Sequence, residues 1–383
     1  MLSLLSRLSL KVRCWLKLSV TVLFLCAATN SFAVIQQSII LPLTFEHETN
    51  PGFSSTVEQP INRAIFVPNY SLVVNNGTEQ LTATASLRVE RSSDQTISED
   101  RNDPSINLVW QQDYETGNFS VAALMNEQST RVSEFTDSGL VYADNTRNTR
   151  TATINWLNNL TEITSLTLNG TITDVTFDRQ VTAGLVDYTY EFLNTRLSYS
   201  LGEQTQSFAQ LSFSRFKPED INGIVNETRS YDVGLTWQAN EIFNMTVSAG
   251  ANETESNLSD SSTKSWQAMF SMQYTTLRTN SHLSVSRNQT PSSTGSINEM
   301  NQLTAGWTYN LSEIDNIALG FNGVQNLTLN NTETKSLSVN YTRQINLSWD
   351  FRLSILDRNI NDNLTSVTSN SVMASIIYNL PNF

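Results

Sequence analysis

Two histidines and several acidic clusters are the first side chains in this sequence whose types and spacing suggest chemistry. His282 and Ser284 are two residues apart, so in an extended segment they share one face, where an imidazole could activate a hydroxyl. Serine is frequent throughout the chain, and the neighbours Leu283 and Val285 occupy the apolar face. Two solvated polar residues therefore explain this spacing better than a catalytic pair does. We interpret His47, which lies between two glutamates, as solvated too.

Acidic clusters occur in three polar segments, and oxygen ligands of this kind are the ones that calcium and magnesium prefer. The clusters are Glu99-Asp100-Asp103, Glu253-Glu255-Asp260 and Asp357-Asn361-Asp362. None has the spacing of a known calcium-binding loop, so we favour a solvated acidic surface over a site for calcium or magnesium. The sequence predicts no enzyme, no metal site and no cofactor.

The first 33 residues have the features of a secretory signal peptide. Basic residues within positions 1–17 precede an apolar run over 18–28, and small residues at 31–33 would permit cleavage before Val34. A lipoprotein modified at Cys26 is the alternative, but a leucine occupies the position before it, where a small residue is required. Both cysteines of the chain precede residue 34, so the predicted mature protein has no disulfide.

The charge balance excludes nucleic acid as a partner. The formal net charge is −13, and removing the signal peptide, with four basic residues and no acid, would make it −17. Charged residues make up 15% of the chain, which is below the roughly 25% of ordinary soluble domains. After the signal peptide, no apolar run approaches the roughly 20 residues of a membrane helix. This composition indicates a chain that alternates polar and apolar residues.

Apolar residues do recur at every second position along most of the chain, which is the pattern of half-buried strands. Over 81–90, for example, apolar residues at odd positions alternate with polar residues at even positions. The same alternation appears over 106–110, 119–125, 152–156, 166–172, 197–201, 231–237, 243–249, 266–274, 305–311, 317–323, 337–341, 349–355 and 372–378. No stretch of comparable length has helical spacing, so the sequence predicts an all-β protein.

Two kinds of connection alternate between these segments. Short polar turns centre near Gly77, Gly117, Asn159, Gly202, Asn240, Leu277, Glu313 and Asn346. Longer polar loops are expected over 49–62, 91–104, 129–147, 174–187, 216–229, 252–264, 288–300, 325–335 and 357–370. Eight hairpins and one strand at each end give about 18 strands, with 16 as the alternative.

Strands of about ten residues with one apolar face, short turns at one end and long loops at the other are typical of a transmembrane antiparallel up-and-down β-barrel. Lipid cannot hydrogen-bond the backbone, so a sheet can span a membrane only when it closes on itself. A soluble propeller has a similar repeat of about 40 residues, but it fits four short strands into each period instead of two long ones. We predict a barrel over residues 34–383, with short periplasmic turns and long extracellular loops.

Aromatic residues cluster near the short turns, as an aromatic girdle at a membrane interface requires. The expected girdle residues are Trp110, Trp156, Tyr199, Trp237, Tyr274, Trp307, Tyr309 and Trp349. Arg287 and Arg343 fall on the same apolar face but near strand ends, where a cation costs only about 0–1 kcal/mol.

The sequence resembles Gram-negative outer-membrane barrels, and more narrowly a group of uncharacterised porin-like barrels, some of which accompany exopolysaccharide or exosortase-type sorting loci. The resemblance rests on FEHETNPGF (45–53), on the segment 89–119 and on the hairpins in which a tryptophan lies beside the turn. Phe383 matches the C-terminal signal read by the barrel assembly machinery. The apolar residues of the last segment lie at even positions, however, whereas Phe383 lies at an odd one. The resemblance implies export to the outer membrane, contact with lipid and lipopolysaccharide and, as is common in porins, a homotrimer.

The polar face would line the lumen, and hydroxyl and amide groups outnumber charges on it. The expected lumen-lining residues are Arg88, Glu90, Asn107, Gln111, Asn169, Arg196, Gln210, His282 and Ser284. Such a wall hydrates neutral or weakly charged solutes, and barrels of about 16–18 strands leave an aqueous channel. The segment 129–147 could fold inward as a constriction or remain outside as an exposed flap.

Two functions fit these expectations. The first is a porin-like diffusion channel, general or saccharide-preferring, for small polar solutes. The second is a non-conducting structural or secretion accessory barrel that serves exopolysaccharide export or surface-protein sorting.

Overall fold

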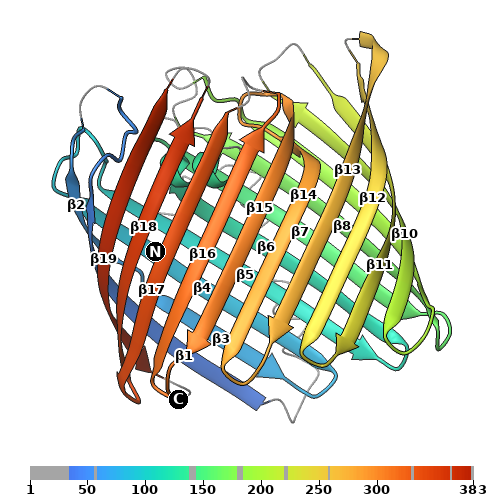
Figure 1. Cartoon of the computed structure of the whole chain (residues 1–383), viewed down its shortest axis with the longest axis horizontal. Helices are drawn as coiled ribbons and strands as arrows, with labels where there is room; N and C mark the ends of the chain where they lie inside the picture. Colours follow the sequence, from blue (N-terminus) through green and yellow to red (C-terminus); the bar gives the residue numbers. More distant parts are fainter. Residues whose placement is uncertain are drawn as a thin grey trace, which may run out of the picture.

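The computed structural model of this chain is one antiparallel sheet that closes on itself (Figure 1). The structure describes residues 34–55, 58–137, 144–178, 184–219, 223–257, 259–328, 332–362 and 365–380, without the side chains of 259–261. The predicted signal peptide and the C-terminal Phe383 lie outside the described residues.

The described chain forms nineteen strand segments and one helix. In order they are β1 (Val34–Glu48), β2 (Ile61–Phe66), β3 (Asn69–Asn75), β4 (Glu79–Ser92), β5 (Arg101–Tyr114), β6 (Gly117–Ser129), α3 (Thr130–Asp137), β7 (Thr146–Asn159), β8 (Thr164–Phe177), β9 (Tyr188–Ser200), β10 (Thr205–Pro218), β11 (Asn226–Asn240), β12 (Phe243–Ser256), β13 (Ser259–Thr275), β14 (Thr279–Pro291), β15 (Ile297–Asn310), β16 (Asp315–Asn326), β17 (Glu333–Asn346), β18 (Trp349–Asn361) and β19 (Ser366–Leu380). The pairing of β1 with β19 closes the barrel.

The segments β2 and β3 occupy one position in the wall. Their pairing with β1 keeps one register, because Leu43 is opposite Phe66 of β2 and Ile40 is opposite Asn69 of β3. Strand β4 also pairs with both segments. The break lies at Pro68, which has no N–H to donate to the ladder. The nineteen segments therefore make 18 wall strands, which confirms the predicted closed antiparallel barrel and its strand number.

The short connections lie where the sequence predicts them, and the longer ones are shorter than predicted. The short ones span 76–78, 115–116, 160–163, 201–204, 241–242, 276–278, 311–314 and 347–348. The expected loop over 252–264 is wrong, because β12 ends at Ser256 and β13 begins at Ser259. Apart from β2 and β3, strands have 12 to 17 residues instead of about ten. The ladder continues after the apolar alternation ends, because backbone pairing does not require an apolar face.

The helix α3 lies within the segment 129–147 and was not predicted. It has only eight residues, too few for a helical apolar period to be recognised. The Ser129 hydroxyl accepts a hydrogen bond from the Arg131 N–H (3.3 Å), as an N-cap does. Figure 1 shows α3 within the ring of strands, near the end opposite the short turns. Among the described residues, no helix has the length and apolar content needed to cross a membrane.

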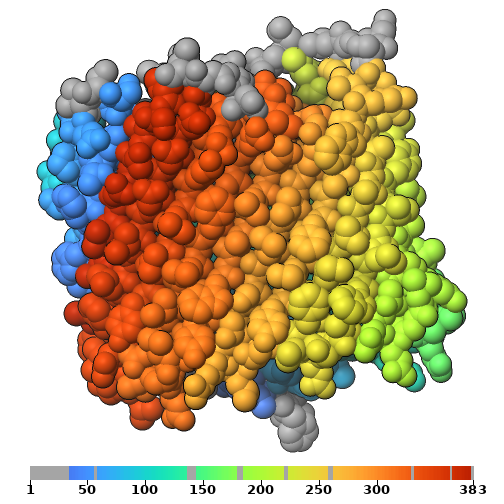
Figure 2. All heavy atoms as spheres, in the orientation of Figure 1, coloured from blue at the N-terminus to red at the C-terminus, as the bar shows by residue number. Residues whose placement is uncertain are grey.

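The two faces of the wall differ in chemistry. Outer side chains such as Val233, Leu193 and Leu353 are apolar and exposed, and Figure 2 shows part of this outer face, over β13 to β19. Inner side chains are mostly polar, and many hydrogen-bond across neighbouring strands, as Thr228 does with Thr254 (2.9 Å). A buried apolar cluster also lies on the inner face, at the ends of β8 to β10 away from the short turns. It consists of Val175, Phe177, Leu185, Tyr188 and Phe216.

Candidate functional site

The register places the expected lumen-lining residues on the inner face, distributed around most of the wall. Two of them hydrogen-bond an acid on their own strand, Arg88 with Glu90 and Gln111 with Asp113, and Arg196 lies over the Phe208 ring. The others lie opposite an inner residue of the neighbouring strand: Asn107 opposite Thr84, Asn169 opposite Asn155, Gln210 opposite Asp232, His282 opposite Gly306 and Ser284 opposite Thr304. Among the nine, the structure joins Arg88 and Glu90 in an ion pair (2.8 Å). That these residues line a solute path stays a prediction.

The expected girdle residues lie on the outer face, all near the ends of strands that carry the short turns. Several pack against an aromatic ring on the neighbouring strand. Trp110 contacts Phe119 with ring centroids 5.9 Å apart, and Trp349 contacts Tyr378 at 4.9 Å. Trp307 instead stacks on Tyr309 of its own strand at 5.8 Å. The interfacial role of this band stays a prediction.

A cluster of buried charges occupies the inner face on both sides of the point where the barrel closes. Arg63 of β2 contacts Glu46 of β1 (2.9 Å) and Glu90 of β4 (3.6 Å). Arg63 also contacts Glu48, which in turn pairs with Arg358 of β18. These side chains are at most 9% exposed, so each charge depends on its partners instead of water.

A second group of charges joins α3 to the wall. Asp144, which follows α3, contacts Arg101 of β5 at 3.4 Å, and Arg101 also holds Asp103 at 3.0 Å. Glu134 of α3 contacts Arg147 of β7 at 3.3 Å. The Ser293 hydroxyl, between β14 and β15, donates to the other oxygen of Glu134 (2.5 Å). The helix is therefore bound both to β7 and to the turn between β14 and β15.

Aromatic packing fixes the other side of α3. Phe135 stacks on Phe53, which precedes β2, with ring centroids 5.6 Å apart and planes 16° apart. The Arg358 guanidinium lies 5.3 Å from the Phe53 ring centre and 5.7 Å from that of Phe135. Phe53 has a φ of 48°, which a bulky residue rarely adopts, so the surrounding packing must compensate for the strain. The segment 129–147 therefore folds inward over its described residues.

Arg131 is the cation that α3 contributes to the barrel interior. Arg131 is 4% exposed and donates to Ser98 at 3.3 Å, while its Nε and Nη1 have no hydrogen-bond partner among the described residues. Burial and the nearby Arg63 lower the pKa of Arg131. An arginine stays protonated in proteins, so this guanidinium remains a positive charge inside the barrel.

The wall from β8 to β17 is almost uncharged on its inner face. Within the described residues of these strands, the inner charges are Arg196 and Asp232. The central carbon of the Arg196 guanidinium lies over the Phe208 ring, 3.5 Å from its centre. The barrel interior thus has a charged sector near the closure, opposite a neutral polar sector.

Comparisons with known proteins support the barrel fold. No protein-family model matches the chain, and no curated protein sequence is similar to it. The solved structure of Pseudomonas aeruginosa OpdO is similar with a TM-score of 0.51 and 12% identity, covering 91% of this chain and 97% of that one. Acinetobacter baumannii OccAB4 is similar with a TM-score of 0.51 and 9% identity, covering 91% and 98%. The chain shares their barrel fold.

The remaining candidates for chemistry are the two histidines and the acidic clusters. The His282 ring lies against Gly306, and no ion pair joins it to a carboxylate in the described part of the chain. His47 is exposed on the outer face, with Nδ1 2.8 Å from the Asn62 side-chain oxygen. Among the described residues, no group of three or more His, Cys, Asp or Glu side chains is placed to hold a metal ion. Four acids of the expected clusters are ion-paired: Asp100 with Arg91, Asp103 with Arg101, Glu253 with Lys264 and Glu255 with Arg229.

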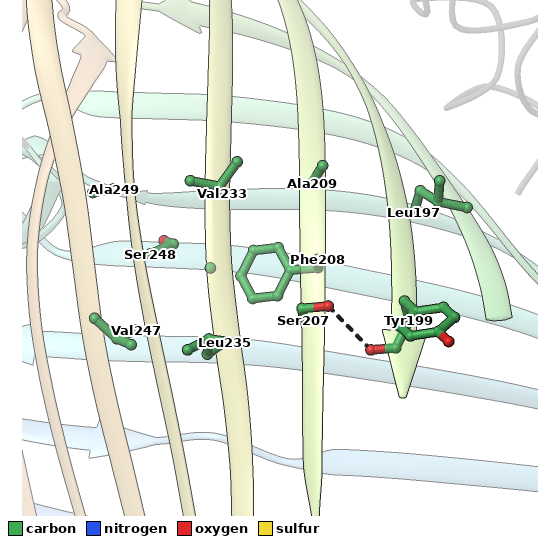
Figure 3. Close-up of a pocket in the computed structure, with 11 residues that line it drawn as sticks. Leu197, Tyr199, Ser207, Phe208, Ala209, Val233, Leu235, Val247, Ser248 and Ala249 are labelled. Carbon is green, nitrogen blue, oxygen red and sulfur yellow. Dashed lines mark hydrogen bonds between the residues drawn. The ribbon is translucent and has the colours of Figure 1, made fainter. Parts of the chain in front are cut away.

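A shallow apolar groove also marks the outer face, between β9 and β12. In Figure 3 its walls include Tyr199, Leu235 and Val247, and the small side chains of Ala209 and Ala249 leave the space between them. The groove opens outward, away from the polar interior, so we assign it no part in a solute path.

The sequence reasoning missed most of the charged cluster. Its signal was available, because Glu46 and Glu48 alternate with the outward Phe45 and so had to face inward. Arg63, in the following polar segment, offered no alternation to orient it, and the partner of Glu48 on β18 could not be assigned before the barrel was closed.

Proposed function

We propose that this chain is an outer-membrane channel for small polar solutes, constricted by α3 and the charged cluster. The observation that carries the proposal is a closed barrel with an apolar exposed outer face and a polar inner face, into which α3 folds. Closure satisfies the backbone within lipid, and polar inner groups hydrate a solute. The barrel fold shared with OpdO and OccAB4 supports a place in the Gram-negative outer membrane.

Reconstitution in a planar lipid bilayer tests the channel. The purified full-length protein should give discrete ion-current steps, and unboiled protein should migrate differently from boiled protein on a denaturing gel. A barrel that shows the heat-dependent migration but never conducts would overturn the proposal and favour the accessory role in exopolysaccharide export or protein sorting. A synthesis or sorting locus beside the gene would be expected in that case.

Several narrower expectations belong to the same proposal. The signal peptide over 1–33, assembly through Phe383 by the barrel assembly machinery, contact with lipopolysaccharide and a homotrimer follow from the sequence resemblance and from export to this membrane. N-terminal sequencing of the mature protein and its mass in detergent test the first and the last. We propose no enzymatic activity. A hydrolytic activity that the parent protein has and that His282→Ala loses would contradict this.

A further inference from the structure

A cavity of about 350 Å³ lies on the inner wall in the neutral sector, across β9 to β15. Its volume is within the range of small-molecule sites, which span roughly 300–1,000 Å³. Tyr190 and Phe192 of β9 line one side, and Gln267 of β13 lines the other. Ile297 at the start of β15 also lines it, four residues beyond the Ser293 that binds α3. The cavity is therefore close to the constriction.

The cavity exists where two neighbouring strands separate. The pairing of β13 with β14 ends at Ala268 and Arg287, whereas β13 continues to pair with β12 as far as Ser259. Gln289 of β14 spans the gap: its Oε1 accepts from Thr254 (2.8 Å) and its Nε2 donates to Ser265 (3.1 Å). This recess therefore has polar walls that are already held in place.

Two nearly parallel aromatic rings line one side of the recess. Tyr190 and Phe192 are consecutive inner-face residues of β9, with ring centroids 6.5 Å apart and planes 17° apart. Tyr190 also packs against the buried apolar cluster that contains Tyr188 and Phe216, which holds its ring in position. Aromatic faces of this kind pack against apolar C–H surfaces, including the C–H face of a sugar ring.

Amide and hydroxyl groups surround the aromatic surface. Asn252 is 3% exposed and lines the cavity, and its side-chain oxygen has no hydrogen-bond partner among the described residues. A buried acceptor without a donor costs about 1–3 kcal/mol, so a ligand hydroxyl that donates to it would be favoured. Ser212 and Gln267 offer further polar groups in the same recess.

None of the described side chains that line the cavity is charged. Asp232 is the nearest inner acid in register, opposite Gln210. No cation lines the recess to hold a carboxylate or a phosphate, which are usually bound by arginine or lysine. The chemistry therefore selects an uncharged ligand.

We propose that this recess binds neutral polyhydroxylated ring solutes, the saccharide class. The apolar face of the sugar ring lies on Phe192 and Tyr190, and its hydroxyl groups donate to Asn252 and exchange hydrogen bonds with Gln267. The inference rests on the proposed channel function, which brings the solute to the inner wall.

Calorimetric titration of the full-length protein in detergent tests the site independently of conduction. Maltose, as a neutral disaccharide, should bind, and glutarate, as a dicarboxylate, should not bind at the same concentrations. Phe192→Ala and Asn252→Leu should each weaken maltose binding about tenfold. Leu193→Ala is the matched control, because Leu193 is adjacent on β9 and faces outward. All variants should keep the heat-dependent gel migration of a folded barrel.

Other results would overturn the inference. Maltose that fails to bind the parent protein, or that binds the folded Phe192→Ala and Asn252→Leu variants as well as the control, excludes the recess as its site. Glutarate binding that these two variants weaken would exclude the neutral class. Maltose binding without any conductance would leave the site in place and overturn the channel. Conductance without maltose binding would leave the channel in place and overturn the site.

Discussion

Arg358 of β18 and Glu48 of β1 form a buried ion pair inside the barrel, although they lie 310 positions apart in the chain. The strand between them, β19, contributes Ser369, whose hydroxyl donates to Glu48 (2.8 Å). The pair therefore spans the seam at which the first and last strands close the sheet. Arg63 adds a second cation to Glu48 from the other side.

Replacing Glu48 should affect both stability and ion selectivity. Glu48→Gln leaves Arg63 and Arg358 without their shared carboxylate, and breaking a buried pair costs about 3–5 kcal/mol. Urea unfolding in lipid vesicles measures that loss. Because a negative charge is removed from the constriction, the reversal potential in a salt gradient should also move toward anion selectivity.

The control for Glu48 is Glu227→Gln on the outer face. Glu227 pairs with Arg215 at 3.8 Å with both side chains well exposed, so its loss should cost under about 1 kcal/mol and leave the reversal potential unchanged. Equal effects of the two substitutions would show that burial at the seam has no special role.

Truncating Phe135 should open the constriction. Phe135→Ala removes the stacking of α3 on Phe53, which together with the Glu134 contacts holds the helix within the barrel. We expect a larger and noisier single-channel conductance in planar bilayers. Val132→Ala, on the exposed side of the same helix, should conduct like the parent protein, and an unchanged Phe135→Ala channel would remove α3 from the solute path.

Neighbouring arginine substitutions on β17 should distinguish the two faces of the wall. Val339 faces outward near the middle of the strand, and Ser338 faces inward. Val339→Arg should lower the free energy of unfolding in vesicles by about 2–4 kcal/mol, because the charge enters lipid near mid-bilayer. Ser338→Arg should cost much less, because the inner face is polar. A larger loss for Ser338→Arg than for Val339→Arg would contradict an outer face in contact with lipid.

Adding a methyl group at Gly234 should strain the inner wall. A Cβ there would lie 2.4 Å from both the Phe208 ring and the Val247 carbonyl oxygen. Gly234→Ala should therefore destabilise the barrel by about 1–3 kcal/mol in urea unfolding, and Phe208→Ala should recover only part of that loss. Gly323→Ala is the matched control, since its Cβ would meet no atom closer than 3.3 Å, and an equal loss there would refute the steric explanation.

The sequence by itself determined the barrel class, the positions of the short turns and which parity faces outward, and it left the strand number between 18 and 16. These features are local, because side chains alternate with a period of two and a closed membrane sheet requires one apolar face. The alternation of Leu337, Val339 and Tyr341 is sufficient to orient β17, and Gly117 and Gly202 lie at or beside two of the turns.

Only the tertiary structure decided the interior of the barrel. The partners of Glu48 come from β2 and β18, and those of Glu134 from β7 and the turn before β15, so the contacts exist only once the sheet has closed with its particular register. The sequence also left the lengths of the longer connections undetermined. At the strand ends away from the short turns, backbone pairing continues beyond the apolar residues, where no alternation of side chains marks a strand. The neutral recess depends on the separation of β13 from β14, a feature of backbone pairing that no side-chain pattern specifies.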